Sequence, residues 1–272
     1  MPTPTPTSRT TKPTPNNHPE LPSDGLIRRG PTDQPYYGFT IDDWESYNDG
    51  KIKVDALEYL QNILEIAREK HAGITFFPTG LALDHFLANY GMSVTRKVWN
   101  QVLSDGHVIG NHTDIHDTNL AALTHSLSYI RNQFSRQQDK LNAVLGWKYD
   151  EFLVRPPGGS GGFRTDDPNT LENRRYLHLQ AALNGLSKWI TMWTTDSNDS
   201  EGRIITPGAT MAQQNSRFLR IMSGPGYEQV GNGSIVLDHP QTLSPVGVST
   251  MFDMFADQGL KSRTVPGLFA AR

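Results

Sequence analysis

Beyond about residue 30, short apolar and β-branched runs alternate with longer segments whose apolar residues recur at helical spacing. Segment 54–70, for example, places Leu60, Leu64 and Ala67 on one helical face. Strands separated by helices form a parallel sheet, because each connection returns the chain to the same end of the sheet. Some seven such units in about 240 residues favour a barrel over an open sheet. We therefore predict an α/β fold, a distorted (β/α) barrel with about seven parallel strands.

The individual elements are separated by turn residues and helix-ending residues such as Gly146. The predicted strands cover residues 35–41, 72–80, 107–112, 152–159, 189–196, 234–240 and 261–265. The predicted helices cover residues 54–70, 95–105, 123–146, 170–186, 209–222 and 246–258. No internal repeat is evident in the sequence.

The N-terminal segment differs in composition from the rest. Residues 1–20 are rich in Pro and Thr and hold nothing that could bury a core, which predicts an extended, disordered segment. We assign residues 1–30 to this tail or linker and residues 31–272 to one folded domain. Such spacers often tether extracellular enzymes, the alternative being a plain disordered tail. We expect an extracellular or cell-wall-associated protein whose export signal has been removed, since no secretion signal is recognisable at the N-terminus.

Composition excludes several functional classes. The formal net charge of −3 argues against a nucleic-acid-binding surface, which requires a basic face. No apolar run approaches the roughly 18 residues of a membrane span, so we expect none. The chain has no cysteine, so any bound metal must be held by His, Asp and Glu side chains.

Polar clusters follow the predicted strands. In (β/α) barrels the chemistry gathers at the C-terminal ends of the strands, where the loops meet at one mouth. We therefore expect five segments to meet there: Asp42-Asp43, His112 with His116, Arg155 with the following Pro-Pro-Gly-Gly, Asp196, and Asp238-His239.

His112 and His116 have the four-residue spacing of neighbours on one helical face. If the segment forms a helical turn, both imidazoles point to the same side. Two His with one carboxylate and a position open to water is the pattern of a catalytic zinc site. The alternative is a chance pair, since the chain has nine His.

Asp42 and Asp43 lie at the end of the first predicted strand. Adjacent side chains on a strand point to opposite faces, but a turn at the strand end can bring both to one site. Two buried carboxylates raise the pKa of one of them unless a metal is near. One carboxylate could then bind metal while the other acts as a general base. The alternative is a solvated loop.

Arg155 and His239 also end apolar runs. A buried Arg is costly unless a carboxylate pairs with it, and Asp196 is the expected partner. The Gly158-Gly159 turn can donate backbone N–H groups to an oxyanion. A His held by a carboxylate can serve as a general acid near neutral pH. A surface Arg in a Gly-rich loop and a structural His are the alternatives.

Taken in order, these clusters resemble the five motifs of the polysaccharide deacetylase family, the NodB-homology domain of carbohydrate esterase family 4. The resemblance spans about residues 36–265 of the chain. It is carried by FTIDDW (39–44), NHTDIH (111–116), RPPGG (155–159), DSND (196–199) and LDH (237–239). FFPTG (76–80) resembles a further, non-catalytic family signature.

The resemblance implies a catalytic domain, a reaction and a set of roles. The reaction is removal of acetyl groups from a glycan that contains N-acetylglucosamine, such as chitin or peptidoglycan, or from acetylxylan. The cofactor would be a divalent metal ion, zinc first, with cobalt or manganese as alternatives, and we expect a monomer. The resemblance implies that Asp42 is the general base and His239 the general acid. Asp43, His112 and His116 would be the metal ligands. Arg155, held by Asp196, would orient Asp42, Leu237 would line the acetyl pocket, and the Gly158 N–H would donate to the oxyanion.

The chain departs from the family pattern around the expected substrate groove. Trp44-Glu45 replaces a common Gly-Pro, Gly158 replaces a Tyr, and Ser200 replaces a Trp. Other aromatic residues could take over sugar stacking, namely Trp193, Trp44 or Phe163. The residues of the reaction are thus retained, while those that select the glycan differ.

Two other functions compete with this interpretation. His112-x-Asp114 with His239 matches the facial triad of a non-haem iron oxygenase. That fold is built mainly of β-strands, which the helical periodicities oppose. A deacetylase fold that binds glycans without catalysis is the second alternative, because a fold does not determine a function.

Overall fold

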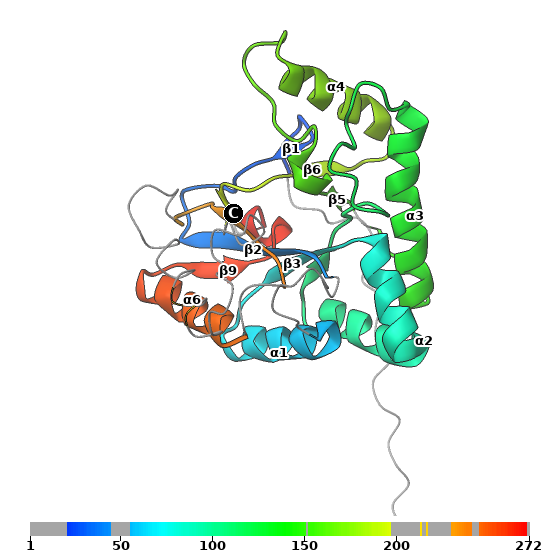
Figure 1. Ribbon diagram of the computed structural model, residues 1–272. Helices are drawn as coiled ribbons and strands as arrows, with labels where there is room; N and C mark the ends of the chain where they lie inside the picture. Colours follow the sequence, from blue (N-terminus) through cyan, green and yellow to red (C-terminus); the bar gives the residue numbers. More distant parts are fainter. Residues whose placement is uncertain are drawn as a thin grey trace, which may run out of the picture.

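The computed structural model describes residues 21–44, 55–150, 152–196, 213, 216, 230–240 and 245–270 (Figure 1). The strands are β1 (Leu26–Ile27), β2 (Tyr36–Asp43), β3 (Ile74–Pro78), β4 (Val108–Ile109), β5 (Leu153–Val154), β6 (Trp189–Thr191), β7 (Thr195–Asp196), β8 (Ile235–Asp238) and β9 (Lys261–Arg263). The helices are α1 (Ala56–Glu69), α2 (Gly80–Ser104), α3 (Leu127–Leu145), α4 (Leu171–Leu183) and α6 (Pro245–Asp257), with short 3-10 helices η1 (Pro157–Gly159) and η2 (Pro266–Leu268).

Every strand pairing among the described residues is parallel, as the strand–helix alternation predicts. The strands form one sheet of order β1-β6-β5 and another of order β4-β3-β2-β8-β7, with β9 also paired to β2. A parallel bridge between Asn111 and Val154 joins the two sheets on one side. The predicted strand 189–196 joins them on the other, because its first part pairs with β5 and its last part with β8. The array therefore has the connectivity of a distorted barrel.

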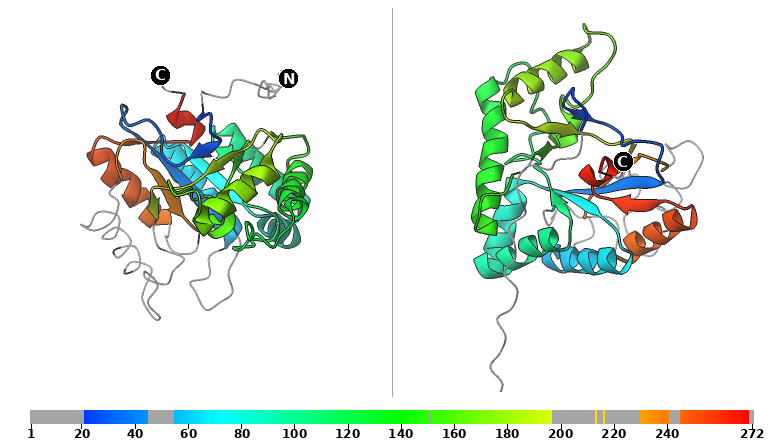
Figure 2. Two further views of the ribbon diagram at one scale, coloured as in Figure 1. Left: turned by 90° about the horizontal axis from the view of Figure 1, so that it is seen from above. Right: turned by 180° about the vertical axis from the view of Figure 1, so that it is seen from behind.

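The helices follow one another around the outside of the strands in the order α6, α1, α2, α3, α4 (Figures 1 and 2). Helices α1 to α4 each begin after a capping side chain; Asp55 accepts a hydrogen bond from Glu58 N at the start of α1, and Ser126 accepts one from Tyr129 N at the start of α3. Gly146 ends α3 in the left-handed conformation, as expected. The largest apolar cluster fills the space between β2, β3, α1, α2 and α6.

Two expectations need correction, and two others concern residues outside the described part. Residues 21–30 are not part of a tail, because β1 pairs with β6 there and Ile27 is fully buried. α2 begins at Gly80, well before the predicted start at residue 95, and bends at Gly91, whose φ of 73° is left-handed. Residues 1–20 and most of the predicted helix 209–222 are outside the described part.

Among the described residues, no helix is both long enough and apolar enough to cross a membrane.

Candidate metal and catalytic site

Asp42 and Asp43 end β2, the long central strand, next to the C-terminal end of β3. Asp43 and the following Trp44 have left-handed φ values of 69° and 66°. This turn brings both neighbouring carboxylates to one side, which a continuing strand would prevent. Asp42 Oδ2 lies 3.6 Å and Asp43 Oδ1 lies 3.2 Å from the same atom, His112 Nε2.

The two His predicted as metal ligands lie at that carboxylate pair. His116 Nε2 is 3.1 Å from Asp43 Oδ1, and the two imidazole centroids are 5.1 Å apart. The ligand atoms of Asp43, His112 and His116 all lie within 4.8 Å of one another. The proposed helical turn is wrong, however, because residues 112–116 are not helical and Thr113 and His116 have left-handed φ values of 68° and 55°.

These three side chains fit a divalent metal. Two imidazoles and one carboxylate are the donor set of catalytic zinc sites, with a position left for water. The His112 Nδ1 atom lies 2.8 Å from the Arg155 carbonyl oxygen, which leaves Nε2 to face the carboxylates. Burial acts to raise the pKa of Asp43, but hydrogen bonds from His112 and His116 outweigh it and hold that pKa well below its usual value. Asp43 is therefore ionised, as a metal ligand must be.

Arg155 is fully buried and binds Asp42 directly. Its Nη1 lies 2.7 Å from Asp42 Oδ1 and donates to Thr40 Oγ1 at 2.7 Å. Its Nε donates to the Thr191 carbonyl oxygen at 3.0 Å. Burial lowers the Arg155 pKa, while the charges of Asp42 and Asp196 oppose that effect. Arg155 thus holds one oxygen of Asp42 and leaves the other facing the His cluster.

Asp196 acts on Arg155 through its charge, and the main ion pair of Arg155 is with Asp42. Asp196 ends β7, and its Cα is in register with that of Leu237 on β8. His239 follows β8, and its Nε2 is 3.9 Å from Asp43 Oδ2. Four strand ends thus meet at one place, from β2, β5, β7 and β8, with the loop that follows β4.

The residues expected to contact the glycan have different environments. Gly158 is exposed in η1 with a left-handed φ of 56°. Leu237 is buried beside the site on β8. Trp193 packs against Phe163 with ring centroids 5.7 Å apart, and its ring also lies 5.6 Å from the Arg155 guanidinium carbon. Phe163 is 44% exposed, so this aromatic pair remains available to a ligand.

Trp44 is not a sugar-stacking surface, contrary to our expectation. It is fully buried, and its Nε1 donates to the Ile41 carbonyl oxygen at 3.1 Å. Its ring packs against Phe76 and Trp99, with centroids 5.2 Å and 6.2 Å away. The left-handed turn after Asp43 directs this large side chain into the core.

The iron oxygenase triad does not form. Asp114 Oδ1 lies 2.6 Å from Lys140 Nζ, and Asp114 does not belong to the group of Asp43, His112 and His116. The structure also alternates strands with helices, in place of the mainly β fold that this alternative requires.

Two supporting residues, Thr40 and Asn111, were not among the predicted site residues. Thr40 accepts the hydrogen bond of Arg155 and donates to the Val236 carbonyl oxygen at 2.6 Å. It precedes Asp42 by two residues on a strand, so alternation places it on the same face, a signal that was available. Asn111 Oδ1 accepts from Thr113 N at 3.0 Å, which shapes the loop before His116.

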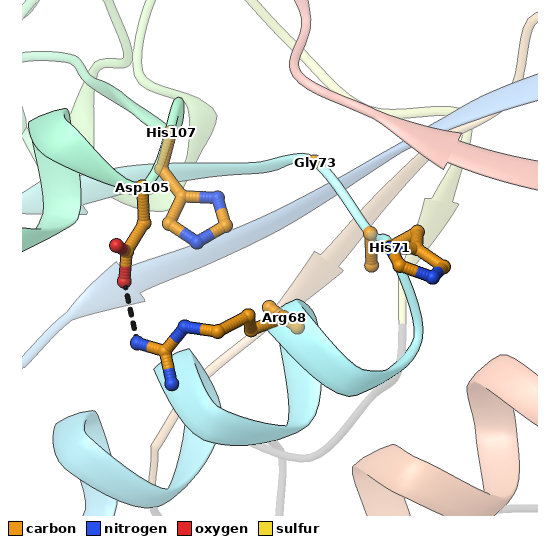
Figure 3. Close-up of a pocket in the computed structure, with 7 residues that line it drawn as sticks. Arg68, His71, Gly73, Asp105 and His107 are labelled. Atoms are coloured by element: carbon orange, nitrogen blue, oxygen red, sulfur yellow. Dashed lines mark hydrogen bonds and ion pairs between the residues drawn. The ribbon is translucent and has the colours of Figure 1, made fainter.

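A separate cavity of about 420 Å³ lies at the opposite, N-terminal end of β3 and β4 (Figure 3). Arg68 and Asp105 both line it and are joined by an ion pair of 3.0 Å. His107 Nδ1 accepts a hydrogen bond from Ile74 N, and burial lowers the His107 pKa to about 4. None of the motif residues lines this cavity.

Comparisons with known proteins agree with this geometry. The family model described as polysaccharide deacetylase matches residues 29–181. A peptidoglycan-N-acetylglucosamine deacetylase of Bacillus cereus is 29% identical over 146 residues, which are 54% of this chain and 43% of that protein. The chain thus spans less than half the length of this curated relative.

Solved structures show the same fold. A family 4 carbohydrate esterase pseudoenzyme from Bacillus anthracis superposes with a TM-score of 0.62 at 22% identity, over 90% of this chain and 68% of that one. The peptidoglycan deacetylase PdaC from Bacillus subtilis gives 0.58 at 20% identity, over 87% and 90%. With the family model covering more than half of its length, this chain belongs to the polysaccharide deacetylase family.

Proposed function

We propose that this protein is an active, metal-dependent deacetylase of a polysaccharide containing N-acetylglucosamine, such as peptidoglycan or chitin, with acetylxylan as the alternative substrate. The observation that carries the proposal is that two carboxylates and two imidazoles meet at one place. His112 Nε2 lies 3.6 Å from Asp42 Oδ2 and 3.2 Å from Asp43 Oδ1, and His116 Nε2 lies 3.1 Å from the same Asp43 oxygen. The name of the Bacillus cereus relative favours peptidoglycan among these substrates. We also propose that the protein works as a monomer outside the cell or at the cell wall.

Zinc, or cobalt or manganese in its place, would be held by Asp43, His112 and His116. When bound, it supplies a Lewis acid that polarises the acetyl carbonyl and brings the pKa of water toward about 7. Asp42 accepts the proton of the attacking water, because Arg155 binds its Oδ1 and leaves Oδ2 facing the site. Water adds to the carbonyl carbon, and the Gly158 N–H donates to the resulting oxyanion.

His239 completes the reaction. Its Nε2 protonates the departing amine or alcohol as the bond to the acetyl carbon breaks, and acetate is released. His239 Nε2 lies 3.9 Å from Asp43 Oδ2, so the imidazole is next to the residues that would hold the metal. Asp196 supports Asp42 through Arg155, and Leu237 lines the acetyl pocket. Trp193, packed on Phe163, offers a face to the sugar in place of the missing Tyr of the third motif.

The test is acetate release from peptidoglycan, chitin oligomers and acetylxylan, with zinc added. We expect release from at least one glycan by the wild type, and its loss in Asp42→Asn. Asp105→Asn is the matched control, since it changes an acidic residue at the opposite end of the barrel and should retain activity.

A catalytically silent glycan-binding module is the second candidate, because one structural neighbour is described as a pseudoenzyme. The experiment passes glycans over a column that carries the wild-type protein. Retention of the glycans without release of acetate from any of them would favour this candidate. Release that persists unchanged in Asp42→Asn would refute the assignment of the general base.

A further inference from the structure

Residues 112–116 form the loop that carries both His ligands, here called the His loop, and neighbouring elements hold it in place. Thr113 and His116 have left-handed φ values of 68° and 55°, a conformation that side-chain-bearing residues rarely adopt. Such a backbone persists only where the surrounding structure imposes it. The contacts of residues 113–115 with α2 and α3 therefore decide where the His116 imidazole lies.

The start of α2 supplies the backbone part of this support. Gly80 N donates to the Thr113 carbonyl oxygen, and Leu81 N to that of Asp114, both at 2.9 Å. The first N–H groups of a helix have no partner inside the helix and are free for such bonds. A Cβ at position 80 would lie 2.1 Å from Asp114 Oδ1, so glycine is needed for this approach. This accounts for Gly80 in the FFPTG signature.

α3 adds a stripe of polar side chains on its inner face. Gln133, Gln137 and Lys140 follow at helical spacing and so share one face. Gln133 Oε1 accepts from Ile115 N at 3.3 Å, and Gln137 Nε2 donates to the Pro78 carbonyl oxygen at 3.0 Å. Figure 1 shows α3 packed beside α2.

Lys140 is the charged member of the stripe. Its Nζ lies 2.6 Å from Asp114 Oδ1 and 2.6 Å from Asp84 Oδ2 of α2. Asp114 is 5% exposed, whereas the Asp84 side chain is 51% exposed. A buried carboxylate depends strongly on its counter-ion, so the contact with Asp114 is the important one. One ammonium group thus ties the His loop to both α2 and α3.

We propose that Lys140, acting through Asp114, is a positioning residue that holds His116 against Asp43 and thereby sets the metal affinity. The proposal rests on the metal site described above. His112 is anchored separately by the Arg155 carbonyl oxygen at 2.8 Å. His116 lies two residues from Asp114, and its side chain is 27% exposed, so its position depends more on the loop. Groups that orient metal ligands typically change affinity about 10- to 100-fold.

The test is zinc affinity, measured by competition with a chromophoric chelator, for the wild type and Lys140→Met. We expect at least about tenfold weaker binding in the variant. Lys70→Met is the matched control, because Lys70 forms an ion pair with Asp253, far from the His loop, and should bind zinc like the wild type. Thermal melts of the metal-free proteins identify a temperature at which each is fully folded.

Two further measurements separate positioning from loss of stability. Cobalt-loaded Lys140→Met should show an altered visible spectrum, because displacement of His116 changes the coordination, whereas mere destabilisation leaves the spectrum of the folded protein unchanged. Asp114→Asn removes the buried carboxylate itself, so no charge is left buried without its counter-ion and the variant should fold. It should also weaken zinc binding several-fold.

Wild-type affinity and an unchanged cobalt spectrum in both variants would overturn the proposal. Because metal binding is measured without turnover, its failure is distinct from failure of the proposed activity. A wild type that binds zinc yet releases no acetate refutes the activity alone. A wild type that binds no zinc overturns both.

Discussion

Replacement of Arg155 by Met should lower the stability of the metal-free protein more than any surface ion pair could. Arg155 has no exposed side-chain surface, and its Nη1 lies 2.7 Å from Asp42 Oδ1. Met fills much of the same volume but leaves Asp42 buried without its counter-ion and removes a donor from the Thr191 carbonyl oxygen. Removing one partner of a buried ion pair costs about 3–5 kcal/mol. At about 2–4 °C per kcal/mol for a domain of this size, Tm should fall by roughly 10 °C.

The assay is thermal unfolding of metal-free protein, followed by circular dichroism, with two comparison variants. Arg68→Met breaks an ion pair in which the Arg side chain is 56% exposed, so we expect a loss of at most about 1 kcal/mol. Asp42→Asn combined with Arg155→Met removes both charges and should recover part of the lost stability. A Tm for Arg155→Met no lower than that of Arg68→Met would refute the reasoning, because it would mean that Arg155 carries no buried pair.

Three further outcomes are expected. His112→Ala and His116→Ala should each lose zinc by elemental analysis, because each removes one of three ligands; full retention of zinc would refute the ligand assignment. Asp196→Ala should retain zinc but lower kcat, because its charge acts on Arg155, and wild-type kcat would disprove that coupling. Burial lowers the His107 pKa from 6.5 in the unfolded chain to about 4 in the folded protein. As pH falls, His107 is therefore protonated in the unfolded chain before it is protonated in the folded protein. The His107 contribution is therefore fully present above pH 6.5 and is lost between about pH 6.5 and 4, by up to roughly 3 kcal/mol. A His107→Gln variant should show a flatter pH dependence of unfolding free energy in that window, and an identical slope would count against this account.

Elements with strong periodicity or capping residues were predictable from the sequence. α1 and α3 lie close to their predicted spans, because their apolar faces and capping residues agree with each other. The early start of α2 was missed because Gly80 and Gly91 weaken the helical pattern, although Thr79 caps the helix. The strand 189–196 was predicted as one element, but its division between two sheets depends on long-range pairing that no local pattern encodes.

At the site, the sequence predicted which residues come together, but it did not predict the directions in which their side chains point. The set of Asp43, His112 and His116 was implied by the family resemblance, and these residues do meet. The helical turn expected for the two His is absent, because Thr113 and His116 have left-handed φ values. Trp44 was one of three aromatic residues expected to replace the missing groove aromatics, whereas the turn at Asp43, with a φ of 69°, places it in the core. The chemistry of a buried Arg predicted Asp196 as the partner of Arg155, and the resemblance predicted that Arg155 orients Asp42; the structure pairs Arg155 directly with Asp42.

The sequence by itself determined the parallel α/β architecture, the order of the five motifs and the donor types available to a metal. Apolar periodicity and residue chemistry are local properties, and they survive without knowledge of distant contacts. Tertiary structure alone decided which side chains meet, since a change of one backbone dihedral at Asp43 or Thr113 redirects a whole side chain. That choice is set by contacts between segments far apart in the chain, such as Lys140 with Asp114 and Arg155 with Asp42.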